Sequence, residues 1–318
     1  MPDQALIAGF DAGQTHTRCR LADARSGAVL AEGKGPGVCH LEVPDGPARF
    51  GRALRSSLRH ALCQISSSRL VAAGIGASGI EVGTPVQDRA RQLAAEALEL
   101  PRKGVLVTGD ERTALRGALG SRQAGIVVIS GTGMIAVGRN DSGEEHRCGG
   151  WGWLLDGAGS AMDIGRDGLA LTLEMADGRQ GDSPLRSRIW AGLNLDPRDP
   201  TAPQTIKARV VAPDFGPAGF ARLAPLVVAA ASEGDPAAAA VVERSAQALA
   251  RMVATIGARL GLEAPPVWPM GGALEHLEPL RQRFAAAVGI HCPGARLEQA
   301  EGDSCSGALA LARQCLDP

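Results

Sequence analysis

The feature that most constrains the fold is a pattern of short strands and turns that occurs twice. In the second half, the apolar run at 126–129 leads through a Gly/Thr turn into a second apolar run at 134–137, a polar turn and a third short segment ending at Cys148. Residues 5–32 follow the same order, with their first Gly/Thr turn at 11–17. Short β-branched runs bounded by Gly and Asp favour strands. The repetition predicts an internal duplication, with two similar lobes each offering one Gly/Thr turn to a shared cleft.

Strands and helices alternate along the rest of the chain. Helical spacing of apolar residues follows at 47–65, and Thr84, Pro85 and Gln87 form a capping box that opens another helix. Strands are expected at 70–77, 104–107 and 265–270. Further helices are expected at 112–119, 160–176, 186–193, 220–231, 236–260, 274–288 and 304–316, the last capped by Ser304 or Ser306. Such alternation predicts an α/β protein.

Composition excludes several classes of partner. The chain has 318 residues, enough for two domains, with a net charge of −1 and no basic block, so we expect neither nucleic acid nor an anionic membrane as partner. No apolar run has the length of a membrane span, and residues 1–4 lack the order of a signal peptide. Seven scattered cysteines without a C-x-x-C pair indicate reduced thiols and a cytoplasmic protein.

The turn at Gly131-Thr132-Gly133 suits a phosphate group. Two glycines around a hydroxyl expose backbone N–H groups that no Cβ covers, and such turns form concave anion-binding sites. The residues alone leave an ordinary β-hairpin equally open.

Five segments carry a resemblance to a known family. Their order and spacing resemble the N-acetylglucosamine kinase group of the BadF-type ATPases, in the superfamily of sugar kinases, actin and heat-shock ATPases. The resemblance covers most of the chain and is thinnest over 175–220. The segments are GFDAGQTHTR at 9–18, TGDERTAL at 108–115, ISGTGMIAVGRN at 129–140, CGGWGWLLDGAGS at 148–160 and MGGALEHLEPLRQRF at 270–284.

This resemblance implies an α/β fold of two ribonuclease-H-like, actin-like ATPase lobes around a central nucleotide cleft. The first lobe is expected at 1–119 with the C-terminal helix 304–318, and the second at 120–303. ATP and Mg²⁺ are the implied cofactors. A small-molecule sugar is the implied partner, and we expect a homodimer.

The resemblance also implies which residues bind ATP and the metal. Asp11 is expected to hold Mg²⁺ through water, because a hard cation prefers oxygen ligands beside phosphates; a strand-end Asp that caps a turn is the alternative. A Gly-Gly pair after a strand is also found in plain strand–helix turns, which is the simpler interpretation of 271–272. The implied nucleotide-binding residues are Gly13, Gln14 and Thr15 in the first phosphate loop, Gly131, Thr132 and Gly133 in the second, and Gly271 and Gly272 at the adenosine.

Asp110 matches the catalytic aspartate of the family. Phosphoryl transfer to a sugar needs a carboxylate within hydrogen-bond reach of the attacking hydroxyl. Asp110 or Glu111 is alternatively the cap of the helix expected from about Arg112.

The sugar side departs from the family pattern. Gly150 and Trp151 are expected to line the sugar pocket, with a core tryptophan as the alternative. The family's acidic pair is replaced by Gly157-Ala158, and Asp156 stands one residue earlier. The family's asparagine in the first-lobe loop falls near Cys39, which is followed by His40, and cysteine is a weak hydrogen-bonding partner for a sugar. The substrate-binding residues expected from the resemblance are Cys39, His40, Asp110, Gly150, Trp151 and Asp156.

We therefore expect an ATP-dependent sugar kinase that phosphorylates a hexosamine at its 6-hydroxyl. N-acetylglucosamine or glucosamine is the first expectation, and a muramic-acid-type sugar stays open. Two alternatives remain: a BadF-like activator ATPase, which needs a cysteine pair for an iron–sulfur cluster, and a non-catalytic sugar- or nucleotide-sensing protein.

Overall fold

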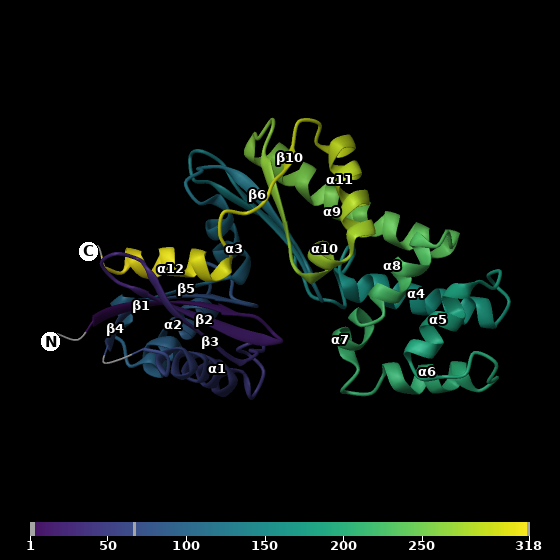
Figure 1. The fold of residues 1–318 in the computed structure, drawn as a ribbon, viewed down its shortest axis with the longest axis horizontal. Coiled ribbons are helices and arrows are strands. Elements are labelled where there is room, and N and C mark those ends of the chain that lie inside the picture. Colours follow the sequence, from purple (N-terminus) through teal and green to yellow (C-terminus); the bar gives the residue numbers. More distant parts are fainter. Residues whose placement is uncertain (1–3, 66–67, 317–318) are drawn as a thin grey trace. The chain divides into compact units, whose positions relative to one another are not determined.

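The computed structural model describes residues 4–65 and 68–316. Residues 1–3, part of the stretch examined for a signal peptide, and 317–318, the end of the last predicted helix, lie outside these ranges. The chain divides into two compact units, Met1–Arg122 with Gln299–Pro318 (unit 1) and Gln123–Glu298 (unit 2) (Figure 1). The predicted lobe bounds at 119 and 303 differ from these by a few residues.

Unit 1 is built on a five-stranded sheet in the order β3-β2-β1-β4-β5. β1 (Gln4–Ala12), β2 (His16–Asp23) and β3 (Val29–Pro36) form an antiparallel meander, while β4 (Ser68–Ala77) and β5 (Val105–Thr108) extend it in parallel to β1. The ends of β1, β3, β4 and β5 therefore meet at one edge of the sheet. This edge carries every site residue predicted for the first lobe.

Helices cover both faces of this sheet. α1 (Gly46–Leu62) and α2 (Pro85–Leu98) pack on one face, α3 (Asp110–Leu119) and α12 (Ser304–Gln314) on the other, and a short 3₁₀ helix, Arg102–Gly104, precedes β5 (Figure 1). α12 lies close to the strands because two glycines face it. A Cβ on Gly9 would lie 2.6 Å from the Cys305 carbonyl oxygen, and one on Gly74 would lie 2.0 Å from that of Ala308. α12 is thus part of the unit 1 core.

Unit 2 repeats the strand order of unit 1. Its sheet has the order β10-β9-β6-β7-β8. β6, β7 and β8 form an antiparallel meander, and β9 and β10 extend the sheet in parallel to β6. The strands are β6 (Gly125–Ser130), β7 (Met134–Arg139), β8 (Glu145–Gly149), β9 (Pro266–Met270) and β10 (Arg296–Leu297). The predicted duplication and α/β class are confirmed by this shared topology.

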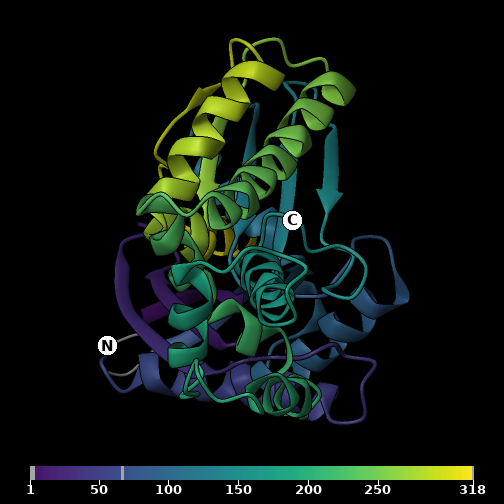
Figure 2. The ribbon, with the colours of Figure 1, turned by 90° about the vertical axis from the view of Figure 1, so that its right-hand side faces the viewer.

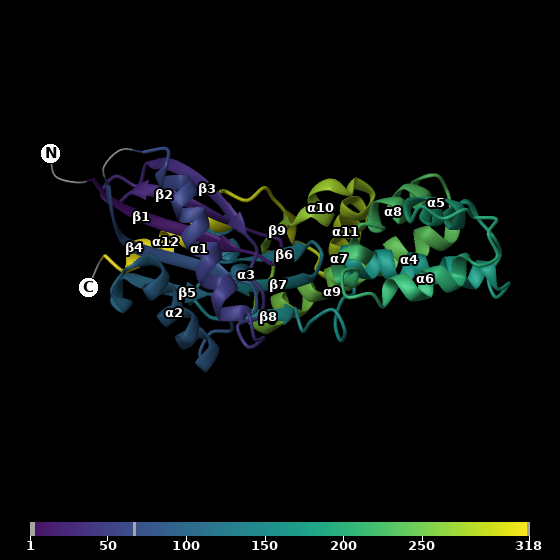
Figure 3. The same cartoon turned by 90° about the horizontal axis from the view of Figure 1, so that it is seen from below.

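The helices of unit 2 form two groups. α9 (Pro236–Leu260) and α11 (Glu278–His291) lie side by side against the sheet (Figure 2), and the short α10 (Gly272–His276) follows β9. Five helices are grouped at one end of the unit (Figure 3), around a core that includes Trp190. They are α4 (Ala161–Ala176), α5 (Pro184–Gly192), α6 (Ala202–Val210), α7 (Gly216–Ala221) and α8 (Ala224–Ser232).

Some predicted elements were wrong in detail. α6 was not predicted, and the single helix expected at 220–231 falls on two helices, α7 and α8, because Pro225 lies in the first turn of a new helix, α8. α12 is capped by Asp303 rather than by a serine.

Of the capping box predicted for α2, only one of the two hydrogen bonds is present. Thr84 accepts from the Gln87 N–H at 3.4 Å, but the Gln87 side chain bonds the N–H of Gly83 instead of that of Thr84.

No single helix in the described ranges is long and apolar enough to cross a membrane. Within the same part of the chain, the helices over Gly216–Ser232 and Pro236–Leu260 reach that length and hydrophobicity when taken together, but they are bent by 116° at their junction.

Candidate active site

The carboxyl edge of the unit 1 sheet brings the predicted first-lobe residues together. The turn at 13–15 closes through the Gly13 N–H, which donates to the His16 carbonyl at 3.1 Å. The segment after β3 lies against this turn: the Val38 N–H donates to the Gly13 carbonyl at 3.0 Å, and a Cβ on Gly37 would lie 2.0 Å from the Gln14 carbonyl oxygen. Cys39, which is half-buried, and His40, which is exposed, follow directly.

Asp110 is the first residue of α3 and is half-buried. Its Oδ1 accepts from the N–H of Glu111 at 3.1 Å. Gly109 is the N-cap and no side chain caps the helix, so neither acidic residue serves as the cap and the helix starts earlier than predicted. Burial, together with the negative charges of Glu111 and Asp11, raises the pKa of Asp110 to about 7. A carboxylate with a pKa near neutrality is suited to accept a proton at physiological pH.

Asp11 stands near the end of β1 and is held by Arg18. The Arg18 Nη2 and Nε atoms lie 2.8 and 3.2 Å from the same Asp11 oxygen, Oδ2. Arg18 also donates through Nη1 to Asp303 at 3.0 Å, and Arg20 makes two further bonds to Asp303. Asp11 therefore takes part in an ionic network and does not cap the turn, whose closing bond comes from backbone atoms.

The donor set around Asp11 fits a magnesium ion bound beside phosphates. Oδ2 of Asp11 accepts both hydrogen bonds from Arg18, while Oδ1 accepts no hydrogen bond from residues 4–65 or 68–316. Within those same ranges no three His, Cys, Asp or Glu side chains are arranged to hold a metal. Mg²⁺ in phosphate-transfer sites commonly uses one or two carboxylates and completes its shell with water and phosphate oxygens. A single free carboxylate oxygen meets that requirement.

In unit 2, the turn after β6 is open. A Cβ on Gly131 or Gly133 would meet nothing within 4 Å, and neither residue has a positive φ. The fold itself therefore does not demand glycine at these two positions, and a bound group that approaches the backbone closely is a physical reason for them.

Gly271 differs, because the fold does require a glycine there. Its φ is +88°, and a Cβ would lie 2.6 Å from the carbonyl oxygen of Ser130 at the end of β6. The adjacent Gly272 has only an ordinary contact at 3.8 Å. Because β6 and β9 are parallel neighbours, this strand–helix turn lies beside the 131–133 turn.

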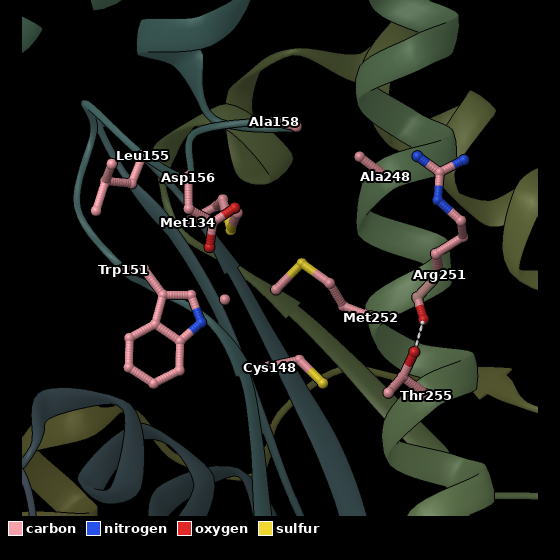
Figure 4. A pocket seen from close by; sticks show the side chains of 11 residues that line it. Met134, Cys148, Trp151, Leu155, Asp156, Ala158, Ala248, Arg251, Met252 and Thr255 are labelled. Carbon is pink, nitrogen blue, oxygen red and sulfur yellow. Dashed lines mark hydrogen bonds between the residues drawn. The ribbon is translucent and has the colours of Figure 1, made fainter.

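A cavity of about 650 Å³ lies within unit 2 between β7, β8, the 151–158 loop and α9. Figure 4 shows Trp151, Leu155 and Asp156 on one wall and residues of α9 on the other. Its lining is mostly apolar. The lining residues are Met134, Cys148, Gly149, Trp151, Leu155, Asp156, Ala158, Ala248, Arg251, Met252 and Thr255. Pockets for small ligands have this size and this mixture of apolar walls with few polar groups.

Two of the predicted sugar-side residues line this cavity. Trp151 is 61% exposed, so the core-tryptophan alternative is wrong, and the Arg147 guanidinium lies 4.3 Å from the centre of its ring. Asp156 is half-buried, and its carboxylate accepts no hydrogen bond from a residue within the described ranges. Gly150 is adjacent to the wall but not part of it.

Sequence reasoning missed several residues of these sites. Arg18 contacts Asp11 and is itself bound by Asp303, and Arg251 and Met252 line the cavity from α9. For Arg18, the alternation of side chains along β2 was an available signal, since the strand pairing places it opposite Asp11.

Two lobes of the same five-strand topology, each with polar turns at the carboxyl edge of its sheet, define an actin-like ATPase fold. The sequence pattern of the BadF/BadG/BcrA/BcrD ATPase family matches residues 8–303. The chain belongs to this family, and the resemblance seen in the sequence is confirmed.

Two curated relatives are kinases. The N-acetylmuramic acid/N-acetylglucosamine kinase of Clostridium acetobutylicum is 26% identical over 286 residues, which are 87% of this chain and 92% of the relative. The N-acetyl-D-glucosamine kinase of Dictyostelium discoideum is 27% identical over 209 residues, 65% of this chain and 64% of the relative.

Solved structures agree with this fold. A candidate N-acetylglucosamine kinase from Chromobacterium violaceum has a TM-score of 0.76 and 29% identity, with 98% of this chain and 99% of that chain covered. A ROK family glucokinase from Streptomyces griseus, in complex with glucose and AMPPNP, has a TM-score of 0.58 at 17% identity, covering 97% and 99% of the two chains. The second likeness supports the fold alone.

Proposed function

We propose that this protein transfers the γ-phosphate of ATP to the 6-hydroxyl of a hexosamine, with N-acetylglucosamine or glucosamine as the first substrate. More broadly, the protein is an ATP-dependent carbohydrate kinase. This assignment rests on the family, on two curated kinase relatives and on a fold shared with sugar kinases.

The environment of Asp110 is the observation that carries the proposal. Its carboxylate stands at the carboxyl edge of the unit 1 sheet, and burial with two neighbouring acids raises its pKa to about 7. The raised pKa makes its carboxylate a stronger base than that of an ordinary aspartate. In the proposed reaction Asp110 accepts the proton of the sugar hydroxyl as that oxygen attacks the γ-phosphate, and ADP leaves.

The remaining residues bind and orient the two substrates. We assign the backbone turns at 13–15 and 131–133 to the phosphates of ATP, and the turn at 271–272 to its adenosine. Asp11 would hold Mg²⁺ through its free oxygen and water, and the ion, when bound, neutralises phosphate charge. No covalent intermediate with the protein is needed, because phosphoryl transfer depends mainly on positioning and charge stabilisation.

We assign the sugar to the unit 2 cavity. Trp151 offers an apolar ring face at its wall, and Asp156 offers unoccupied oxygens to sugar hydroxyls. Arg251, also in the wall, makes no ion pair within the described ranges and suits a substrate that carries a carboxylate. A muramic-acid-type sugar therefore belongs in the substrate panel. Cys39 and His40 stay candidates for sugar binding from the first lobe.

The test is an ADP-release assay with ATP, Mg²⁺ and a panel of glucose, glucosamine, N-acetylglucosamine and N-acetylmuramic acid. We expect sugar-dependent ADP release with an amino sugar, and product analysis that locates the phosphate on the 6-oxygen. Background rates with every sugar, while ATP still binds, would favour a non-catalytic sensor.

Tryptophan fluorescence tests the cavity separately from turnover. The chain has no tyrosine and four tryptophans, of which Trp190 and Trp268 are buried while Trp151 and Trp153 are exposed. Sugar binding should change the emission of the wild type and of Trp153→Phe, but not that of Trp151→Phe. If sugar changes the emission of Trp151→Phe as much as that of the wild type, the sugar does not bind in this cavity.

The activator-ATPase alternative is tested by iron analysis after anaerobic purification. A bound cluster needs cysteines that two copies can share, and Cys148 instead stands in the cavity wall. The cytoplasmic location and the homodimer expected from sequence stay predictions.

A further inference from the structure

Arg18 faces Asp11 across the ladder between β1 and β2. The two residues are direct partners in the antiparallel register. Two nitrogens of the Arg18 guanidinium, at 2.8 and 3.2 Å, converge on Oδ2 of Asp11. Side chains of directly opposed residues lie on the same face of a sheet, so this contact follows from the strand pairing itself. The result is that one carboxylate oxygen is bound and the other is left for a ligand.

The far side of the guanidinium is anchored as well. Arg18 Nη1 lies 3.0 Å from Oδ2 of Asp303. The other oxygen of Asp303 accepts from the N–H of Ser306 at 3.0 Å and thereby caps α12. Arg20 holds the same carboxylate at 2.7 and 3.0 Å. Arg18 is thus fixed between a strand end and a helix N-terminus and cannot rotate freely.

We propose that Arg18 is a positioning residue for the metal-bound nucleotide: it holds Asp11 through Oδ2 and thereby keeps Oδ1 free to hold a hydrated Mg²⁺. This inference rests on the proposed nucleotide and metal sites. Residues that hydrogen-bond a metal-binding carboxylate orient it, and their loss typically weakens metal binding about 10–100-fold. Arginine suits the position because its planar fork bridges two carboxylates, which a lysine ammonium cannot do with fixed geometry.

Arg20 provides a matched control. It stands two residues along the same strand, carries the same charge and also binds Asp303, but its contacts are to Asp303, Glu32 and Ser306 and not to Asp11. Arg18→Met and Arg20→Met therefore remove one positive charge from the same network, and only the first releases Asp11. A purely structural network predicts similar effects for the two variants.

The experiment measures Mn²⁺ binding by electron paramagnetic resonance in the presence of ADP, with ADP affinity in EDTA as a second readout. We expect Arg18→Met to raise the Mn²⁺ dissociation constant about 10-fold or more, and Arg20→Met to stay close to the wild type. Metal-free ADP affinity should change little in either variant. Equal weakening in both variants, or none in Arg18→Met, would overturn the proposal.

A second variant covers the case in which Arg18→Met does not fold, as judged by circular dichroism. Arg18→Lys keeps the charge but loses the fork, and we expect weaker Mn²⁺ binding in the same direction; binding equal to that of the wild type would overturn the proposal. A wild type that binds ADP without any metal dependence would also overturn it. A wild type with metal-dependent ADP binding but no sugar turnover would overturn only the hexosamine kinase proposal.

Discussion

At the scale of single residues, the basicity of Asp110 is produced by its neighbours. An isolated aspartate has a pKa of about 4 and is a weak base at neutral pH. Here burial is the largest cause of the raised pKa, followed by the charges of Glu111 and Asp11. The fold puts Glu111 next to Asp110 in the first turn of α3 and brings Asp11 from β1 to the same edge of the sheet.

Replacing Asp110 tests its role as base. Asp110→Asn is nearly isosteric, so we expect ADP binding to persist while turnover falls about 10²–10⁴-fold, the usual contribution of a general base. The measurement is the ADP-release rate at saturating sugar, with calorimetric ADP binding as control. Near-normal turnover would remove Asp110 from this role.

The pH profile gives a second test at the same residue. A base acts only when deprotonated, so kcat/KM of the wild type should fall below about pH 7, where Asp110 takes up a proton. Glu111→Gln removes one of the two charges that raise the pKa of Asp110, and the acid limb should therefore move to lower pH. A limb that stays in place would show that Asp110 does not control it.

At the scale of secondary-structure elements, alanine substitutions in the two glycine turns of unit 2 are expected to change stability in opposite directions. Gly133→Ala has room and a permitted φ, so we expect stability to rise by about 0.4–1 kcal/mol through a less flexible unfolded chain. ATP binding should nevertheless weaken, because the new Cβ projects where a phosphate would lie.

Gly271→Ala is the matched comparison. It adds the same methyl group at φ +88° and ψ 150°, against the Ser130 carbonyl, and this backbone conformation, which is essentially restricted to glycine, alone costs about 1–3 kcal/mol in another residue. Denaturant unfolding and ATP titration of both variants distinguish the two cases. Unchanged ATP affinity in Gly133→Ala would argue against a phosphate at that turn.

The elements that sequence predicted well are those with local causes. The β-branched run at 126–129 and the Asp235-Pro236 start of α9 depend on neighbouring residues, and both are present in the structure. α6 was missed because its only buried residues, Ala202 and Ile206, leave a weak apolar stripe. The Arg18–Asp303 contact joins residues 285 positions apart, and no local pattern indicates such a pairing. The cavity wall from α9 was missed likewise, since periodicity shows that Met252 lies near the buried face but not what it faces.

At the scale of the whole molecule, the two units differ in how the chain builds them. Unit 2 is one continuous segment, 123–298, with its own large core. Unit 1 is discontinuous and needs 299–318, because α12 packs on β1 and β4 and the glycines of those strands admit its backbone. The two units therefore share a sheet topology, but only unit 2 is formed by one continuous segment of the chain.

Truncation tests this asymmetry. A chain that ends at residue 298 loses α12 and exposes the face of β1 and β4; burial of Leu309 alone contributes about 1.5–3 kcal/mol. We expect unit 1 to unfold in this variant, while the fragment 123–298 keeps a cooperative thermal transition. Hydrogen exchange followed by mass spectrometry reads both units in one experiment. Protected amides in β1 and β4 of the 1–298 chain would contradict the prediction, and so would an unprotected sheet in the fragment 123–298.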